Sequence, residues 1–242
     1  MNAAAVSLHG SSASSVPREA LTGVRTALPA GIAMFPLGMA LGVLISQSAL
    51  PWWTAPLFTG VIFAGSLEFL LVGMVVAAAP LTSVALTALL VNFRHVFYAL
   101  SFPLGQIRSR SLRVLSTYIL CDEAWALTAH PEARQWTGAR ILGIQAVFYL
   151  NWVFSATIGV LAGSLIPPGV VGLDFAITAF FLVLGIDAYR VRRSVPIPLV
   201  ALACALFFVI FTGDAMILPA MGTFVGLLLV SYGAKRWRWR RG

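Results

Sequence analysis

Apolar windows of about twenty residues follow one another along almost the whole chain. A helix of about that length crosses a hydrocarbon core of about 30 Å. Because backbone groups in lipid must pair within their own segment, such windows predict a bundle of transmembrane helices. Short alternating strands, which a membrane barrel needs, are not found. Charged residues make up only 10% of the chain, against about 25% in an ordinary soluble domain. The sequence therefore predicts an all-α, polytopic membrane protein.

The windows define eight expected spans joined by short turn-forming linkers with no soluble domain between them. The spans are 26–48, 56–79, 81–102, 112–129, 140–164, 171–189, 195–211 and 214–233. We expect a single transmembrane domain, 21–235, between a disordered tail, 1–20, and a basic tail, 236–242. The span 112–129 is the weakest, and it can be re-entrant or broken where protein shields its backbone. The prediction is therefore seven or eight crossings.

The net charge of +8 comes from cations at the ends of the apolar segments, with Arg94 as the exception. This distribution is typical of topogenic charge at the cytoplasmic face, and it argues against nucleic-acid binding. One loop disagrees. With the N-terminus inside and eight crossings, Arg108 and Arg110 are expected on the outside.

The first span is rich in helix-breaking residues, which predict a kinked or interrupted helix. They are Pro29, Gly31, Pro36, Gly38 and Gly42. Transporters use such breaks to direct half-helix ends at a substrate near the membrane midplane. A simple proline kink in a packed helix is the alternative, and the sequence leaves both open. Residues 140–189 loosely echo 25–73, which indicates a weak internal repeat.

Two spans carry polar side chains that are expensive in lipid. Glu68 lies deep in the second span, where a carboxyl group facing the bundle interior can exchange protons. It can equally be a structural partner of Arg94, or a neutral acid bonded to backbone. In the third span, Asn92, His95 and Tyr98 recur every three residues and share one helix face. His95 can relay protons, because an imidazole titrates near neutral pH.

The Arg94 charge needs an anionic partner, and the candidates are Glu68, Asp174, Asp187 and a substrate carboxylate. Four further residues are secondary candidates. Asp122 and Glu123 mark a solvated helix end or partners for Arg113. Trp152 lines a cavity or belongs to an interfacial belt, and Asp174 begins a helix.

Signatures of soluble chemistry are absent from the sequence: there is no Walker loop, dinucleotide fingerprint, metal-ligand spacing or nucleophile elbow. We therefore expect no cofactor and no metal. Any pumping must use an ion gradient or a partner protein.

An ordered set of short motifs resembles the AzlC-type branched-chain amino-acid permease family over about residues 20–235. The motifs are Arg25-x3-Pro29, Pro36-Leu37-Gly38, Phe63-Ala64-Gly65-Ser66, Val91-Asn92-Phe93-Arg94-His95, Asp122-Glu123, Tyr149-x2-Trp152 and Gly172-Leu173-Asp174-Phe175-Ala176. The resemblance implies a bacterial inner-membrane exporter of branched-chain amino acids. It also implies a small AzlD-type membrane subunit as partner and proton-coupled transport. Where the family pattern usually has Gln, this chain has Glu68.

The leading hypothesis is a secondary exporter of small amphiphilic amino acids that works with protons in the lipid bilayer. Its central site is expected to contain Glu68, Asn92, Arg94, His95 and Tyr98, with Gly65, Ser66, Pro36 and Gly38. A transporter or channel for another small solute is the first alternative. An intramembrane acid–base enzyme using Glu68 and His95 is the second, and it lacks a clear nucleophile.

Overall fold

The computed structural model describes residues 15–48, 50–166, 182, 186, 196–213 and 216–239. Every regular element in this part of the chain is a helix, which confirms the predicted all-α class. Contacts divide the chain into two compact units. Unit 1 comprises Met1–Val76 and Phe93–Gly169, and unit 2 comprises Ala77–Asn92 and Val170–Gly242. The single transmembrane domain over 21–235 stays a prediction.

Unit 1 holds seven of the described α-helices and two short 3-10 helices. They are α1 (Ser15–Gln47), α2 (Thr54–Val61), α3 (Gly65–Val76), α5 (Arg94–Ser101), η1 (Leu104–Gln106), α6 (Arg110–Tyr118), α7 (Asp122–Thr128), η2 (Pro131–Gln135) and α8 (Gly138–Gly163). Unit 2 holds α4 (Leu81–Asn92), α10 (Pro196–Thr212) and α11 (Ile217–Trp239).

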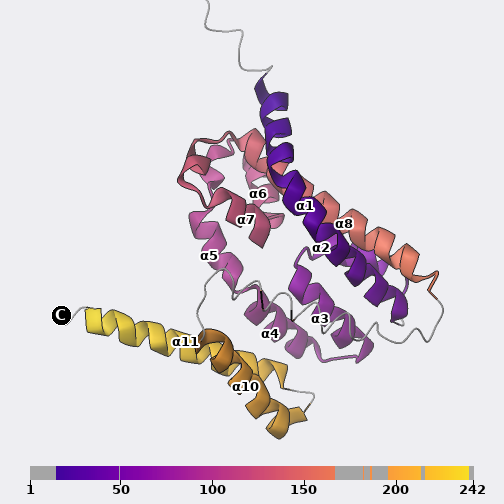
Figure 1. The fold of residues 1–242 in the computed structure, drawn as a ribbon, viewed down its shortest axis with the longest axis vertical. Coiled ribbons are helices and arrows are strands. Elements are labelled where there is room, and N and C mark those ends of the chain that lie inside the picture. Colours follow the sequence, from indigo (N-terminus) through magenta and orange to yellow (C-terminus); the bar gives the residue numbers. More distant parts are fainter. Residues whose placement is uncertain are drawn as a thin grey trace, which may run out of the picture. The chain divides into compact units, whose positions relative to one another are not determined.

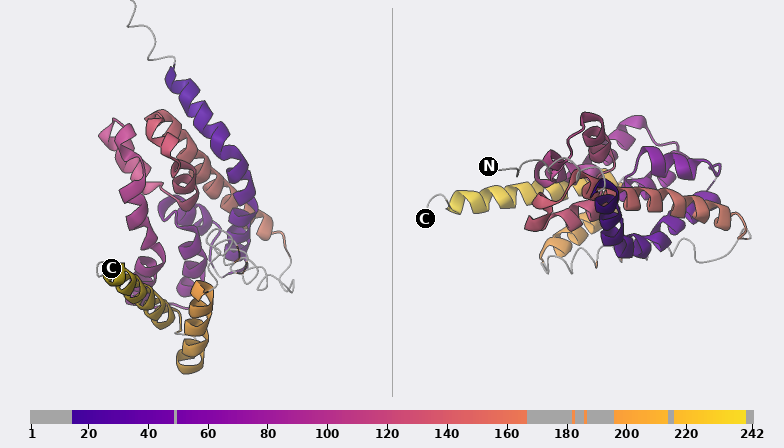
Figure 2. Two further views of the ribbon diagram at one scale, coloured as in Figure 1. Left: turned by 60° about the vertical axis from the view of Figure 1, so that its left-hand side comes forward. Right: turned by 90° about the horizontal axis from the view of Figure 1, so that it is seen from above.

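Helices α1 and α8 pack side by side along their lengths (Figures 1 and 2). The backbone of Ala20 lies against Gly143, and Ser46 lies against Gly163. Both residue numbers rise together along the contact, so the two helices run parallel. Glycines allow this close approach: a Cβ at Gly42 would lie 2.1 Å from the Ala156 carbonyl oxygen.

Helix α1 is continuous through Pro29 and Pro36, so the interrupted alternative for the first helix is wrong, and the proline kink stays a prediction. Each proline removes one backbone N–H from the helix. The contact with α8 extends on both sides of the prolines, from Gly23 to Gly42, and Ala27 and Leu41 are fully buried. We attribute the continuity of α1 to this packing, which the local sequence does not reveal.

The breaks occur instead in the second and fourth predicted spans. The second is divided into α2 and α3, and the fourth into α6 and α7. In the third, α4 and α5 meet at Phe93, which keeps a helical φ and ψ. The half-helices of the second and fourth spans leave backbone groups without intrahelical partners near the middle of a span. They are the structural feature that the sequence had led us to expect in α1.

Helices α6 and α7 form a hairpin whose two outer ends lie beside the start of α8. Before α6, the Gln106 side-chain amide donates to the Arg134 carbonyl oxygen, and a Cβ at Gly138 would meet the Gln106 backbone. Ser116, near the end of α6, bonds Gln145 of α8 at 2.7 Å. After α7, the chain returns through η2 to α8. The fourth span therefore enters and leaves at one end of unit 1.

This hairpin corrects the predicted position of one loop. Arg108 and Arg110 lie at the end of unit 1 where α1 and α8 begin, close to Arg134 and Arg140, and not at the opposite end. The expectation failed because the fourth span folds back on itself as the α6–α7 hairpin. With the loop at this end, the four arginines lie at the same end of unit 1, as the positive-inside rule requires.

Both predicted tail boundaries differ from the helices. Helix α1 begins at Ser15, within the predicted tail 1–20, and the Thr137 hydroxyl donates to Glu19 at 3.1 Å. Helix α11 continues to Trp239, into the predicted tail 236–242.

The helices long and apolar enough to cross a membrane, among the described residues, are Val16–Gln47, Leu81–Tyr98 and Gly138–Gly163. Shorter apolar helices are Gly65–Val76, Pro196–Thr212 and Pro219–Tyr232. In unit 2, α10 packs against α11. The predicted span 171–189 falls almost entirely outside the described residues, and the number of crossings stays a prediction.

Candidate functional site

The second span breaks at Phe63, which lies between α2 and α3. Its φ of 47° is in the left-handed region, which residues with a bulky side chain rarely adopt. Such strain persists only where surrounding contacts hold it, and it is concentrated at functional sites. The Phe63 ring packs edge-on against Tyr149 of α8, with ring centroids 5.0 Å apart.

Glu68 lies in the first turn of α3 and is fully buried. One carboxylate oxygen accepts the backbone N–H of Ala64 at 2.7 Å. The other accepts the indole N–H of Trp152 at 2.8 Å. A negative charge is also favourable at this end of a helix, where the dipole is positive. The carboxyl group therefore joins the start of α3 to the middle of α8.

The carbonyl end of α2 is held by two tyrosines from other helices. The Tyr149 hydroxyl donates to the Gly60 carbonyl oxygen at 2.9 Å. The Tyr118 hydroxyl, at the end of α6, lies 2.6 Å from the same oxygen and 2.7 Å from that of Val61. The last carbonyls of a helix have no partner within it. Here side chains from α6 and α8 supply the donors.

These contacts bring three half-helix ends together at the middle of α8. Tyr149 and Trp152 each lie about 17 Å from an end of α8, at about 1.5 Å per residue. The carbonyl end of α2 bonds Tyr149, and Glu68 in the first turn of α3 bonds Trp152. The Tyr118 side chain at the end of α6 reaches the same place through the Gly60 carbonyl oxygen. Transporters build midplane binding sites from discontinuous helices in this way. We use the name break site for the residues that make these contacts around Glu68, which are Gly60, Val61, Ala64, Glu68, Tyr118, Tyr149 and Trp152.

Arg94 and Asp122 form an ion pair, 3.0 Å apart, between the starts of α5 and α7. Their side chains are 43% and 40% exposed, so Arg94 is not the buried charge that the sequence predicted. Of the expected partners, Glu68 is not the one that Arg94 contacts, and Asp174 and Asp187 lie outside the described residues. Glu68 is held by N–H donors of Ala64 and Trp152. The pairing depends on the α6–α7 hairpin, which sequence spacing does not show.

Asp122 was expected to mark a solvated helix end or to pair with Arg113, and the second alternative is wrong. The Arg113 guanidinium donates to the Ile107 carbonyl oxygen at 2.9 and 3.3 Å. Glu123 follows Asp122 in the first turn of α7.

Aromatic rings continue from the ion pair toward the outer end of the hairpin. His95 packs edge-on against Tyr98, whose ring stacks on Trp125 with centroids 4.8 Å apart. The Trp125 indole donates to the Ser101 hydroxyl at 2.8 Å. Trp125 and Ser101 also line a cavity of about 140 Å³. The ion pair and these rings form a second group, which we name the ion-pair site.

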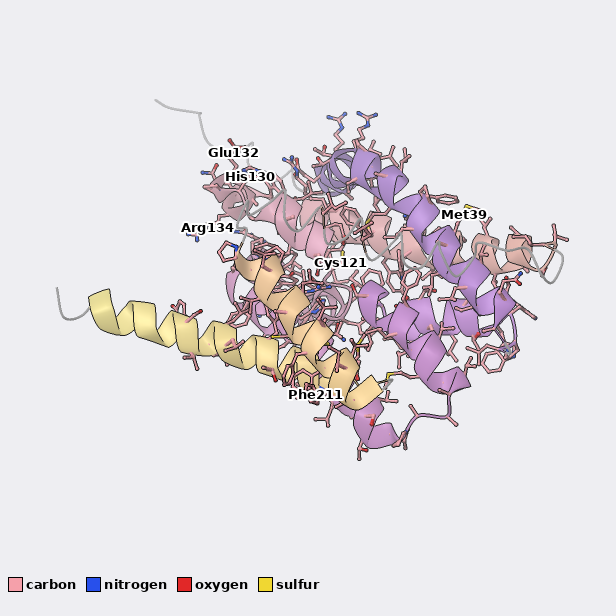
Figure 3. All side chains as sticks on the ribbon, turned by 60° about the horizontal axis from the view of Figure 1, so that its bottom comes forward. Met39, Cys121, His130, Glu132, Arg134 and Phe211 are labelled. Carbon is pink, nitrogen blue, oxygen red and sulfur yellow. The ribbon has the colours of Figure 1, made fainter. Side chains whose placement is uncertain are left out.

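The cavity opens at the outer end of the hairpin. His130 and Arg134 belong to its lining, and they lie with Glu132 beyond the end of α7 (Figure 3). Cys121, at the inner tip of the hairpin, is labelled in the same view. Trp125 therefore belongs both to the ion-pair site and to the lining of the cavity.

The remaining predicted residues are distributed over several places. Gly65 lies against the break site, since a Cβ there would lie 3.3 Å from the Trp152 ring, and Ser66 follows it at the start of α3. Gly38 lies in the α1–α8 contact against Ser155, and Pro36 lies in the continuous α1. Asn92 ends α4, in unit 2, and Asp174 and Asp187 lie outside the described residues.

Tyr118 is the residue that sequence reasoning missed, together with the carbonyl groups of Gly60 and Val61. Backbone carbonyls have no signature in a sequence. The available signal for Tyr118 was its place in the weakest span, just before Asp122 and Glu123. No three His, Cys, Asp or Glu side chains are grouped as metal ligands within the described part of the chain.

Comparison with known proteins gives consistent matches over most of the chain. The family model described as "AzlC protein" matches residues 29–166. The branched-chain amino acid transport protein AzlC of Bacillus subtilis is 31% identical over 85% of this chain and 84% of its own length. The inner membrane protein YgaZ of Escherichia coli is 26% identical over 72% and 75%. An uncharacterized membrane protein of Haemophilus influenzae is 28% identical over 80% of each chain. No solved structure matches the chain.

Proposed function

Because the chain belongs to the AzlC family, we propose that it exports branched-chain or similar small amphiphilic amino acids across the bacterial inner membrane. The Bacillus subtilis relative is named a branched-chain amino acid transport protein, and the chain is a helical membrane protein. We further propose secondary active transport driven by protons, with a small AzlD-type membrane subunit as partner.

Glu68 in the break site is the observation that carries this proposal. It is a fully buried carboxyl group at an interrupted helix, with both oxygens held by N–H donors. A buried acid of this kind is expensive in a membrane protein and is by default a candidate for proton or substrate transfer. Alternate protonation of Glu68 would weaken its bonds to α3 and α8, and so link proton binding to helix movement.

The ion-pair site supplies an anion-binding group for the same substrate. An amino acid carries a carboxylate, and a guanidinium binds carboxylates in bidentate geometry. Arg94 is half-exposed, and Tyr98 of the same helix stacks on Trp125, which lines the cavity at the outer end of the hairpin. In this proposal a substrate entering from the cytoplasm exchanges with Asp122 on Arg94 before it reaches the break site.

Valine uptake into inverted membrane vesicles tests the function. An inside-acid proton gradient should drive accumulation in vesicles that contain the chain and its small partner. The Glu68→Gln variant keeps an acceptor for Trp152 and removes the titratable group, so gradient-driven accumulation should fall at least about tenfold. Glu132→Gln, at an exposed position in η2, is the matched control and should behave as the unmodified chain. Absence of valine flux with both subunits present would refute the proposal.

A further inference from the structure

The carbonyl oxygens at the end of α2 have more acceptor lone pairs than the two tyrosine hydroxyls that contact them have protons. Three oxygen–oxygen contacts of 2.6, 2.7 and 2.9 Å connect Tyr118 and Tyr149 to the carbonyls of Gly60 and Val61. Each hydroxyl has a single proton to donate. The two carbonyl oxygens have four acceptor lone pairs for two hydroxyl protons, and Tyr118 has to share its one proton between both oxygens. A group with more donors would satisfy the carbonyl oxygens better.

The charges around these carbonyls favour a cation. The carbonyl end of a helix has a partial negative charge, and α2 ends here. The Glu68 carboxyl group lies across the break. Within the described part of the chain, no cationic side chain bonds Glu68, Gly60 or Val61. Arg94 is held by Asp122, and Arg113 is held by the Ile107 carbonyl.

We infer that the ammonium group of the transported amino acid binds at the carbonyl end of α2, where it replaces the Tyr118 hydroxyl and donates to the Gly60 and Val61 oxygens. This inference rests on the proposed transport function and specifies which part of the substrate the break site recognises. An ammonium group has three N–H donors and no acceptor, so it satisfies acceptors that one hydroxyl has to share. Displacing Tyr118 also releases the end of α6 from α2, which links substrate binding to the hairpin.

Two fragments of valine separate recognition of the ammonium group from recognition of the carboxylate. Valinol has the ammonium group and the branched side chain but no carboxylate. The other fragment, 3-methylbutanoate, has the carboxylate and the branched side chain but no ammonium group. A site built to bond a polar group strongly rejects an analogue that lacks it. Binding of each compound to the purified full chain is measured by titration calorimetry in a sodium-free buffer. Valinol should bind, and 3-methylbutanoate should bind at least about a hundredfold more weakly.

The Tyr118→Phe variant tests the role of the hydroxyl. It removes the group that competes with the substrate, so the dissociation constant of valinol should fall about three- to tenfold. Tyr232→Phe, at an exposed position in α11, is the control and should leave it unchanged. The fragment comparison on the unmodified chain does not depend on the folding of any variant.

The outcomes separate this inference from the proposed function. Failure of valinol to bind, binding of 3-methylbutanoate alone, or displacement of valinol by sodium ions at equal concentration would each overturn the ammonium site. An unchanged valinol affinity in a folded Tyr118→Phe variant would overturn the displacement of the hydroxyl. Valinol binding without any valine transport would instead overturn the function and leave the ammonium site in place.

Discussion

Glu68 and Asp122 are two carboxyl groups in the same local setting and in opposite surroundings. Each lies in the first turn of a half-helix that follows a break. Glu68 is fully buried and bonded only to N–H donors, whereas Asp122 is 40% exposed and paired with Arg94. A half-exposed carboxylate that is paired with a cation costs little free energy to keep charged. A buried carboxylate without a cationic partner costs more, so the contacts of Glu68 depend more strongly on whether it is protonated. This difference underlies our proposal that Glu68 couples transport to protons and that Arg94 with Asp122 receives the substrate.

Removing each carboxyl group should give the largest contrast between the two sites. Glu68→Ala leaves the buried N–H groups of Ala64 and Trp152 without acceptors, at about 1–3 kcal/mol each. The free energy of unfolding should therefore fall by about 2–6 kcal/mol. Asp122→Ala removes a half-exposed ion pair and should lower it by about 1 kcal/mol or less. Denaturant unfolding in detergent measures the free energy of unfolding of both variants. Equal losses would contradict the proposed difference between the surroundings of Glu68 and Asp122.

A single methyl group tests how closely α3 must approach Trp152. A Cβ at Gly65 would lie 3.3 Å from the Trp152 ring, so Gly65→Ala requires the ring to shift by a few tenths of an ångström. Since the Trp152 indole holds Glu68, valine transport should fall about three- to tenfold. Gly73→Ala in the same helix meets no described atom within 4 Å. Transport assays should show this control unchanged, and its stability should be equal or up to about 1 kcal/mol higher. Equal transport in both variants would contradict the role of the contact.

The ion pair itself should give the smallest effect on stability. A double-mutant cycle of Arg94→Ala and Asp122→Ala should measure a coupling energy of about 1 kcal/mol or less. The coupling should decrease further in high salt, because both side chains are partly exposed. A salt-independent coupling of several kcal/mol would show that the ion-pair site is sequestered like the break site.

The positions of the spans could be predicted from sequence, but the breaks within them could not. Hydrophobic windows gave α1, α8, α10 and α11 to within a few residues at most ends, with a longer error at the start of α1 and the end of α11. Proline predicted a break in α1 that does not occur, because packing against α8 extends over the proline region. The actual break is at Phe63, which is neither glycine nor proline, and the flanking Gly60 and Gly65 do not by themselves distinguish a break from close helix packing.

The break site and the ion-pair site also differ in how much of each could be predicted from the sequence. Glu68 was identified because an acid in an apolar span is rare, whereas its partner Trp152 was only a secondary candidate. Arg94 was identified as a charge that needs a partner, but its pairing with Asp122 depends on a hairpin that returns to its own side. Tyr118 could not be assigned, since its function comes from carbonyl groups on α2.

Valine-driven proton movement in proteoliposomes tests most directly whether Glu68 is the coupling acid. Proton flux is followed with an enclosed pH dye, and exchange is followed as labelled-valine counterflow in the same preparation. The account predicts that Glu68→Gln retains counterflow while its valine-driven proton flux falls to background, and that Asp122→Asn retains measurable proton flux. Proton flux that persists in Glu68→Gln, or that is lost only in Asp122→Asn, would contradict it.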